Sequence, residues 1–401
     1  MLELEAALAR ILTALPAPLM QRVALSSAAG RILAEDVFAP IALPPFDNSA
    51  MDGYAVKAAD TTLAGATAPV ALQLVGRVAA GAIFNAEVTT GQCVRLFTGS
   101  PLPRGADAVV MQEGTRVSPD RPEEVLIRDR VQTGENVRPC GDDVSVRTKL
   151  VAAGEVLTAA RLGLLAAVGL GEVSVGRQPI VGLLATGSEL RECGEPLAPG
   201  QIYESNRAAL APLIAQAGGR AKIFPLVPDS VDATQSALEA VFAECDVVVT
   251  SGGVSVGEMD FVKAAFEAMG GELQFWKVAM RPGKPFVFGR CGGKFLFGLP
   301  GNPVSAFVTF LLLVRPALRR WQGATEVALP AQVGLAGETF SNSGDRRHFL
   351  RVRVDHEGKV FSAGRQASHA LSSLATANAL LSLLPGALLS AGMTVKVLRW
   401  D

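Results

Sequence analysis

The sequence predicts a multidomain α/β protein. It would have a central α/β domain with a mostly parallel, doubly wound sheet, a helical or mixed domain, a β-rich domain and a C-terminal domain resembling a β-barrel. Strand-like and helix-like segments alternate between residues 178 and 321, the pattern of a parallel sheet with helices on both faces. On either side lie short apolar stretches broken by Gly and Pro, which are typical of β domains. The length of 401 residues allows about two to four domains.

Two separated helical stretches predict a discontinuous domain. Residues 2–15 repeat Leu, Ala and Ile at helical spacing and stop at Pro16, and residues 159–168 have the same apolar character. We therefore predict one helical or mixed domain made of residues 1–40 and 141–177.

Two further domains are predicted to be rich in β-structure. Residues 41–140 contain short apolar pieces, such as 70–75 and 93–97, punctuated by Gly and Pro. The tail, residues 322–401, returns to an alternating pattern, as in 349–354 and 393–398, and predicts the barrel-like domain.

The central domain, residues 178–321, is the most regular part of the chain. Its predicted strands are 180–185, 221–227, 246–250 and 273–278, and its predicted helices are 206–217, 230–243 and 261–269. A last helix begins at Asn302-Pro303, which supplies an N-cap followed by proline at the first helical position.

Composition excludes several classes of protein. Lys and Arg number 37 against 38 Asp and Glu, with no basic block, so neither nucleic acid nor an anionic membrane is an expected partner. The mean hydropathy is +0.32, yet the longest apolar run, residues 306–314, falls well short of the ~20 residues that span a bilayer. The N-terminus carries Glu3 and Glu5 and no basic segment, so we expect a cytoplasmic protein without a secretory signal.

Cysteine and histidine give no metal or disulfide signal. The five cysteines are widely spread and form no C-x-x-C pair, and the three histidines all follow residue 347 without H-x-x-x-H spacing. A disulfide framework, a thiolate metal site and zinc hydrolase chemistry are therefore not expected.

A glycine-rich loop follows the predicted strand 246–250. Its glycines and serines let backbone N–H groups approach an anion, and the next helix adds its N-terminal dipole; they are Ser251, Gly252, Gly253, Ser255 and Gly257. Such a loop alone is more often a simple turn, but its place between strand and helix favours phosphate binding.

Three acids, Glu189, Asp229 and Asp260, follow strands at the same edge of the predicted sheet. Each alone could serve as a helix cap, whereas three on one crevice favour a shared ligand. Packed carboxylates need a cation, and oxygen ligands suit Mg²⁺. The sequence thus predicts a Mg²⁺-assisted phosphate reaction.

Two more stretches fit an oxyanion pocket. Lys277, Arg281 and Lys284 place three cations near a strand end, and residues 298–303 stiffen a turn with prolines directly before a helix. A Pro-Gly turn without those cations would be an ordinary turn with no binding role.

Several motifs, in order along nearly the whole chain, closely resemble those of the molybdopterin molybdenumtransferases, a family that includes the E domain of gephyrin. The motifs are Pro-Pro-Phe-Asp-Asn-Ser-Ala-Met-Asp-Gly-Tyr-Ala-Val at 44–56, Thr-Gly-Ser-Glu-Leu at 186–190, Ser-Gly-Gly-Val-Ser-Val-Gly at 251–257, Pro-Gly-Lys-Pro at 282–285 and Gly-Leu-Pro-Gly-Asn-Pro-Val-Ser at 298–305.

The resemblance implies a reaction in which adenylylated molybdopterin and molybdate give molybdenum cofactor and AMP. It further implies four domains and a homodimer whose cleft lies between the α/β domain of one subunit and the β-rich domain of the other. A transient contact with other proteins of cofactor biosynthesis is also expected.

The resemblance also assigns residues. The essential acids of the family fall on Asp52, Asp143, Glu189, Asp229 and Asp260, with Thr98 beside them. The molybdate pocket falls on Lys277, Arg281, Pro300, Pro303, Arg346 and Ser368. Of the acids, Asp229 and Asp260, with Glu189, are the expected Mg²⁺ ligands.

For some positions, another interpretation competes with the role that the resemblance implies. Asp52-Gly53 is also a strong signal for a tight hairpin turn. Position 281 is Arg where the family usually has Lys, so a bidentate fork replaces a point charge. The glycine usual after Asp143 is missing from its expected place. On the alternating strand near residue 350, a solvated face is the alternative for Arg347, Arg351 and Arg353.

Two other functions compete. A molybdopterin adenylyltransferase resembles residues 178–320 alone and shares the Ser-Gly-Gly loop, but it would not need the domain of Asp52 and Thr98 or the tail. A scaffold role like that of gephyrin is disfavoured because all five acid positions are intact.

Overall fold

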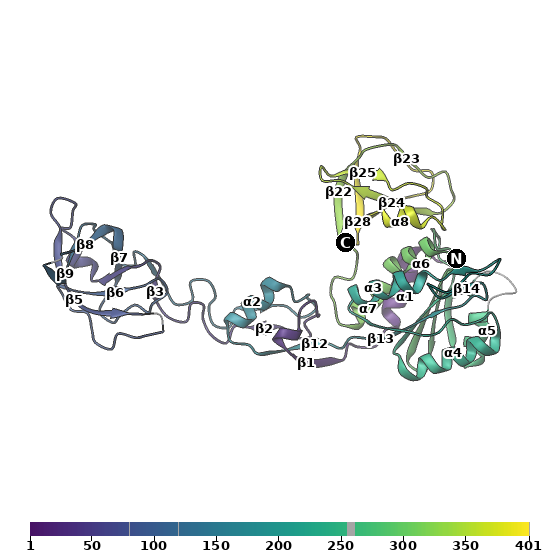
Figure 1. The fold of residues 1–401 in the computed structure, drawn as a ribbon, viewed down its shortest axis with the longest axis horizontal. Coiled ribbons are helices and arrows are strands. Elements are labelled where there is room, and N and C mark those ends of the chain that lie inside the picture. The colour runs from purple at the N-terminus through teal and green to yellow at the C-terminus, as the bar shows by residue number, and fades with distance from the viewer. Residues whose placement is uncertain (80, 119, 255–260, 401) are drawn as a thin grey trace. The chain divides into compact units, whose positions relative to one another are not determined.

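The computed structural model describes residues 1–79, 81–118, 120–254 and 261–400. The chain divides into two compact units (Figure 1). The larger unit comprises Met1–Glu35, Ala153–Leu157 and Val173–Asp401, and the smaller unit comprises Asp36–Ala152 and Thr158–Glu172. The four domain boundaries expected from the sequence are finer than this division and stay a prediction.

A six-stranded sheet forms the centre of the larger unit. Its order is β16 (Arg220–Ile223), β13 (Ile180–Ala185), β17 (Val247–Ser251), β21 (Lys294–Leu299), β20 (Val287–Cys291) and β18 (Glu272–Trp276). The first four strands pair in parallel, and β20 is antiparallel to both of its neighbours. The prediction of a mostly parallel sheet is confirmed.

The hairpin of β20 and β21 was not among the predicted strands. Cys291 pairs with Lys294 across Gly292 and Gly293, which have φ of 53° and 80°. Two consecutive residues with positive φ are the mark of a type I′ turn, so the Gly-Gly pair was the available signal. The predicted strand 221–227 is also shorter in the structure, where β16 ends at Ile223.

Helices cover both faces of this sheet (Figure 1). Along β17, Val247 and Val249 pack into one core with α1, α3, α6 and α7, whereas Val248 packs into the other core with α4 and α5. The bounds are α1 (Leu4–Ala14), α3 (Asn206–Gln216), α4 (Val231–Glu244), α5 (Phe261–Ala268), α6 (Pro303–Thr309) and α7 (Arg315–Trp321), with a π-helical turn at Phe310–Val314 between the last two. Pro303 opens α6, as predicted.

The close fit of α4 on the sheet depends on a glycine in β13. A Cβ at Gly182 would lie 2.1 Å from a methyl carbon of Val241 in α4. Glycine at this position therefore lets the helix approach the strand directly.

The C-terminal part forms a closed five-stranded barrel, which confirms the barrel-like prediction. The ring runs β24 (Arg347–Val354), β25 (Lys359–Ser362), β22 (Ala331–Ala336), β28 (Thr394–Arg399) and β26 (Ala379–Leu383), and β26 pairs back with β24. β19 (Met280–Arg281) adds in parallel to the start of β24. Shorter elements are β23 (Phe340–Ser341), β27 (Leu388–Leu389) and α8 (Leu371–Ala375).

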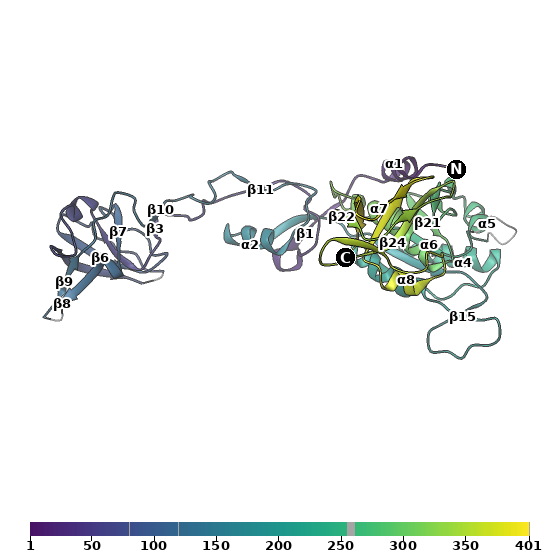
Figure 2. The same cartoon turned by 90° about the horizontal axis from the view of Figure 1, so that it is seen from above.

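Two short strand pairs complete the larger unit. β1 (Met20–Ala24) pairs with β12 (Glu172–Gly176), and β14 (Leu190–Arg191) pairs with β15 (Ile202–Tyr203). The segment that carries β15 extends away from the central sheet (Figure 2).

The smaller unit is rich in β-structure, as predicted. Its sheet has the order β7 (Ala108–Met111), β4 (Gly53–Val56), β6 (Gln92–Leu96), β5 (Val70–Val78), β9 (Arg121–Ile127) and β8 (Thr115–Ser118). The other elements are β2 (Val37–Phe38) with β11 (Lys149–Val151), β3 (Asn48–Ser49) with β10 (Val137–Arg138), and α2 (Ala159–Ala167). Among the helices that the structure describes, none is long and apolar enough to cross a membrane.

Candidate functional site

A cleft of about 660 Å³ opens where β13, β17 and β21 end in the larger unit. The loop that follows each of these strands contributes to its lining, as expected for the carboxyl edge of a parallel sheet. The predicted site residues that line it are Glu189, Asp229, Ser251, Gly252, Gly253, Pro300 and Pro303.

The loop after β17 has the backbone of an anion cradle. Gly252 and Gly253 have φ of 90° and 66°, in the left-handed region that favours glycine. A Cβ on Gly252 would lie 2.5 Å from the carbonyl oxygen of Thr186, so the neighbouring loop also requires glycine there. The remaining predicted residues of this loop and helix start, Ser255, Gly257 and Asp260, lie outside the described residues.

Asp229 joins two of the strand-end loops. Its carboxylate accepts a hydrogen bond from the Ser188 backbone N–H at 3.0 Å, and the Ser188 hydroxyl accepts one from the Asp229 N–H at 3.0 Å. The cap of α4 is Ser230, whose hydroxyl accepts from Ala233 N–H, so the capping interpretation is wrong for Asp229.

Glu189 lies on the same cleft with an exposed side chain. A carboxylate oxygen of Glu189 would lie 2.7 Å from a Cβ on Gly187, so the side chain turns back over this glycine. No helix begins here, because β14 follows at Leu190, and a helix cap does not explain this acid either.

These two carboxylates fit the chemistry of a magnesium site. Mg²⁺ in phosphate enzymes is held by one or two carboxylates, with water and substrate oxygens completing the shell. Within the described ranges, no group of three or more His, Cys, Asp and Glu residues could hold a metal by itself. Glu189 and Asp229 are described acids on the cleft that could hold a metal together with oxygens of a bound phosphate.

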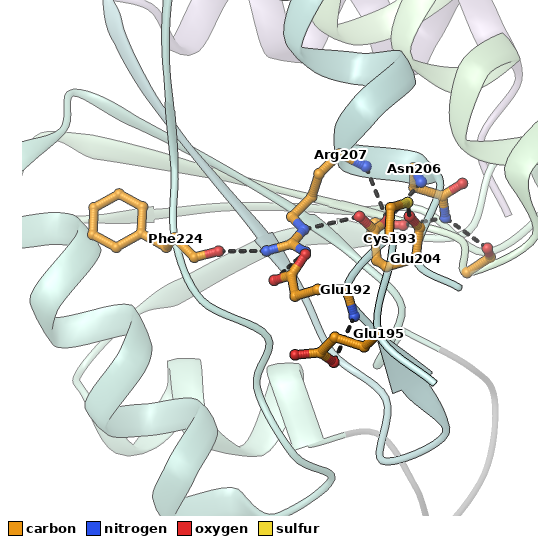
Figure 3. A network of polar contacts seen from close by, with 9 residues as sticks. Glu192, Cys193, Glu195, Glu204, Asn206, Arg207 and Phe224 are labelled. Carbon is orange, nitrogen blue, oxygen red and sulfur yellow. Dashed lines mark hydrogen bonds and ion pairs between the residues drawn. The ribbon is translucent and has the colours of Figure 1, made fainter. Parts of the chain in front are cut away.

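A polar network at the start of α3 was missed by the sequence reasoning (Figure 3). Asn206 donates from Nδ2 to the Ser251 hydroxyl at 2.6 Å and to the Gly301 carbonyl at 2.7 Å. It thereby ties α3 to the loops after β17 and β21. Asn206 also lines the cleft, so this network holds the cleft wall in place.

Two charged residues, Glu204 and Arg207, hold the backbone at Asn206 in place. Glu204 is buried and accepts from the backbone N–H groups of Asn206 and Arg207 and from Arg207 Nε, at 2.5 to 2.9 Å. Arg207 Nη2 also donates to both carboxylate oxygens of Glu192 at 2.8 Å (Figure 3). Burial lowers the pKa of Arg207, but the bonds to Glu192 and Glu204 outweigh it and raise that pKa. The Glu-x-x-Arg spacing at a predicted helix start was the only sequence signal for this pair.

The described lining of the cleft does not include the predicted cationic residues, although it includes Pro285, which follows Lys284. Lys277 has φ of 89° after the end of β18 and donates its N–H to the Phe286 carbonyl, and the Lys284 carbonyl accepts from the Val278 N–H. Arg281 lies in β19 opposite His348, and Arg346 Nη1 donates to the Met280 carbonyl at 3.2 Å. The barrel strand thus brings Arg281 and Arg346 together.

Ser368 reaches the start of α6. Its carbonyl accepts from the Val304 N–H at 3.1 Å, next to Pro303, and the neighbouring His369 lines the cleft. Ser368 therefore lies next to Pro303, although it comes from the C-terminal part of the chain, and Pro300 lines the same cleft as Pro303.

In the smaller unit, Asp52 and Thr98 form a pair. Asp52 Oδ1 accepts from the Thr98 N–H at 2.7 Å and from its hydroxyl at 2.9 Å. These bonds, with the charge of Arg95, keep the pKa of the Asp52 carboxyl below its ordinary value, against a small effect of desolvation. Gly53 opens β4, which pairs with β6 and β7 and not with β3, so the hairpin-turn interpretation of Asp52-Gly53 is wrong.

Asp143 also belongs to the smaller unit. Its side chain is exposed, and its backbone N–H donates to the Leu43 carbonyl at 3.0 Å. The structure thus pairs Asp52 with Thr98 and gives Asp143 no such bond among the described residues.

One expectation for the barrel is wrong. Arg351 is fully buried, so a solvated face does not describe it. Its Nη2 donates to the carbonyls of Arg365 at 2.8 Å and Ala367 at 3.2 Å, and the Ser373 hydroxyl lies 3.2 Å away. Arg347 is part-buried beside Glu5 and Ser382, and only Arg353 is exposed. Leu350 and Val352 fill the barrel core, so Arg351 lies on the outer face of β24, where the segment of Arg365, Ala367 and Ser373 buries it.

The chain matches three regions of one family. Residues 2–169 match the MoeA N-terminal region (domain I and II), residues 182–320 a probable molybdopterin binding domain, and residues 334–400 the MoeA C-terminal region (domain IV). The molybdopterin molybdenumtransferase of Haemophilus influenzae is 39% identical over 96% of this chain and 94% of its own. Molybdopterin molybdenumtransferase 2 of Mycobacterium tuberculosis is 40% identical over 94% of each.

Comparison with solved structures agrees with the sequence matches. A crystal structure of the molybdopterin biosynthesis moeA protein from Pyrococcus horikoshii OT3 is similar with a TM-score of 0.85 and 30% identity, covering 100% of both chains. The fold and the matched regions define a multidomain α/β protein of the MoeA type. The chain belongs to the molybdopterin molybdenumtransferase family.

Proposed function

We propose that this protein inserts molybdenum from molybdate into adenylylated molybdopterin, giving molybdenum cofactor and AMP. The observation that carries the proposal is the agreement of the whole chain with molybdopterin molybdenumtransferases, together with a cleft that combines a glycine loop and two acids. The cleft lies within the region that matches a probable molybdopterin binding domain.

The cleft residues have distinct roles in this proposal. The backbone N–H of Gly253 would bind phosphate oxygens of the substrate, as in other glycine loops at strand ends, while the Gly252 N–H donates to the Leu299 carbonyl at 3.1 Å. Asp229 and Glu189, with Asp260, would hold Mg²⁺, which when bound would neutralise charge on the pyrophosphate. Asn206 keeps the loops of Ser251 and Gly301 at a fixed separation while the substrate binds.

Molybdate binding is assigned to the cationic residues Lys277, Arg281, Lys284 and Arg346. Arg281 and Arg346 present guanidinium forks, and Lys277 and Lys284 add point charges near the same strand end. Ser368, with Pro300 and Pro303, would border the anion at the start of α6. The fork of Arg281 can donate two parallel bonds to an oxyanion, which lysine cannot.

Asp52, Thr98 and Asp143 would act from the smaller unit. A homodimer, in which this unit of one subunit serves the cleft of the other, is part of the proposal. So are a cytoplasmic location and a transient contact with other cofactor-biosynthesis proteins.

The competing functions have less support. An adenylyltransferase would need little beyond residues 182–320, whereas the matches continue over 2–169 and 334–400. Incubation with ATP and molybdopterin separates the two enzymes, because only an adenylyltransferase forms the adenylylated product. A scaffold would not require the acids Glu189 and Asp229 on the cleft.

The proposal is tested by mixing purified protein with adenylylated molybdopterin, Mg²⁺ and molybdate and measuring AMP. We expect molybdate-dependent AMP release, and a fall of about a hundredfold in Asp229→Asn, because a group that acts on developing charge is lost. Asp232→Asn, an exposed acid in the first turn of α4, is the matched control. Absence of molybdate-dependent AMP from the unmodified protein would rule the function out.

A further inference from the structure

One histidine, His369, lines the cleft of the larger unit and has no role in the proposed function so far. It is exposed, and it lies on the segment that connects β25 to α8. Within the described ranges of the chain, its imidazole makes no hydrogen bond or ion pair. Both ring nitrogens are therefore available to a molecule bound in the cleft.

The segment of His369 is fixed against the turn that precedes α6. The Ser368 carbonyl accepts from the Val304 N–H at 3.1 Å. In the same turn, a Cβ on Gly301 would lie only 3.6 Å from the Gly252 Cα. The turn thus contacts the glycine loop on one side and the histidine segment on the other. His369 is separated from the expected phosphate loop by the width of this one turn.

The other titratable side chains of the described lining are engaged in other ways. They are Glu189, Tyr203, Glu204 and Asp229. Two of them, Glu189 and Asp229, are the acids assigned to Mg²⁺. Glu204 is buried, and its carboxylate bonds the first residues of α3. The Tyr203 hydroxyl donates to the Glu195 carbonyl at 2.8 Å. Within this described lining, His369 is the titratable residue that is free to exchange a proton.

Histidine also has suitable chemistry for proton exchange near neutral pH. Its side chain changes charge between about pH 5 and 8, whereas a carboxyl group ordinarily does so near ~4 and a tyrosine near ~10. Two cations belong to the surroundings: Arg365, exposed on the same segment, and Lys284, which precedes the lining residue Pro285. Arginine and lysine ordinarily stay charged over that range, so neither is the source of a change there.

We propose that His369 is a catalytic residue, which takes a proton from the water that cleaves the pyrophosphate of the substrate. The water oxygen forms a bond to the phosphorus on the molybdopterin side, and one water proton moves to the imidazole. The bond from this phosphorus to the bridging oxygen breaks, and AMP leaves with that oxygen and the electron pair. The second water proton stays on the new phosphate. This inference rests on the proposed function, which supplies an adenylylated substrate and releases AMP.

The experiment measures molybdate-dependent AMP release by the full-length protein, with Mg²⁺, as a function of pH. In the unmodified protein, kcat should rise about tenfold per pH unit while the histidine is protonated and level off once it is neutral. His369→Gln and His369→Ala should lower kcat about a hundredfold at pH 8 and lose this dependence. KM for the adenylylated substrate should change less than about threefold, because the proton moves only in the transition state.

Free imidazole supplies a matched rescue. In His369→Ala the missing side chain leaves room for the added base, so kcat should recover about tenfold. The glutamine of His369→Gln fills that room, and imidazole should not help this variant. His356→Gln is the control, because the His356 side chain is 90% exposed on the turn between β24 and β25. It should retain the rate and the pH profile of the unmodified protein.

Failure of this inference and failure of the proposed function give different results. If His369→Gln and His369→Ala keep the rate and the pH profile of His356→Gln, His369 is not the proton acceptor, although AMP release is intact. A lower rate with an unchanged pH profile and no rescue by imidazole would also overturn the inference. Absence of AMP release by the unmodified protein would overturn the proposed function and this inference with it.

Discussion

Asn206 shows how one uncharged side chain can organise a cleft. Its two amide hydrogens reach the Ser251 hydroxyl and the Gly301 carbonyl, which belong to different strand-end loops. The bonds are short, and the residue is held in turn by the buried carboxylate of Glu204. The loops that would bind phosphate are therefore positioned by a residue with no charge of its own.

Replacing Asn206 by Ala should lower kcat/KM for molybdate-dependent AMP release by about tenfold to a hundredfold, because a small displacement of positioning groups is costly in catalysis. The midpoint temperature of thermal unfolding should change much less than kcat/KM. Gln201→Ala, which removes a side-chain bond from the neighbouring loop segment, is the control. An unchanged kcat/KM in Asn206→Ala would show that the two bonds do not matter for turnover.

The buried residue His348 makes the stability of the barrel depend on pH. Burial, and then the charges of Arg281, Arg351 and Arg346, lower the pKa of His348 to about 4. In the unfolded chain a histidine has a pKa near ~6.5. Between these values the unfolded state binds more protons than the folded state, so the free energy of unfolding rises with pH in this window.

Accordingly, the barrel should lose at most about 3 kcal/mol of stability as the pH falls from about 6.5 to about 4. Hydrogen exchange of the β24 and β26 amides, corrected for intrinsic rates, measures this local stability. His348→Gln should flatten the pH dependence, whereas His356→Gln, with an exposed side chain, should leave it unchanged. A slope that persists in His348→Gln would assign it to another group.

At the scale of elements, β24 combines two tasks. Its first residues extend the pairing with β19, which places His348 opposite Arg281. Further along the strand, Arg351 bonds the carbonyls of Arg365 and Ala367 on the outer face of the barrel, and Gln366 in turn bonds the Arg351 backbone. This segment leads directly to Ser368, so the strand positions a predicted molybdate residue without contacting the ligand.

Arg351→Met should destabilise the barrel by about 2 to 3 kcal/mol, because buried carbonyls lose their donors. It should also raise KM for molybdate through Ser368. Arg353→Met, two residues on and exposed, should change neither quantity noticeably. Urea unfolding and steady-state kinetics in molybdate measure the two effects. Equal stability of the two variants would contradict the anchoring role of Arg351.

The elements also show where sequence patterns are sufficient. The limits of β13 and the start of α6 at Pro303 agree with the prediction because a buried apolar run and a cap followed by proline are local signals. The β20–β21 hairpin was missed although Gly292-Gly293 marked it, because a pattern of alternating strands and helices does not include two strands in succession. Arg351 was misassigned because alternation along a strand does not reveal that a later segment, with Arg365, Ala367 and Ser373, covers the outer face of the barrel.

For the whole molecule, the predicted acids divide between the two units. Asp52, Thr98 and Asp143 belong to the smaller unit, whereas Glu189 and Asp229 belong to the larger one. A reaction that needs both sets requires the units to act together. The proposed homodimer meets this requirement by pairing units of different subunits.

Subunit mixing tests this arrangement. Asp52→Asn and Asp229→Asn should each be inactive alone. After co-expression, random pairing makes half of the dimers mixed, each with one intact cleft of two, so roughly a quarter of the activity should return. No recovery from dimers shown to be mixed would mean that each cleft uses acids of a single subunit.

The sequence alone determined the class of fold, the order of four of the six central strands and of the helices between them, and the family motifs. Those depend on local periodicity, capping and short strings of residues. Only the tertiary structure decided that Asp229 bonds Ser188 instead of capping α4, that Asn206 joins two loops, and that Arg351 is buried. These facts depend on contacts between residues far apart in the chain, which a pattern along one segment cannot contain.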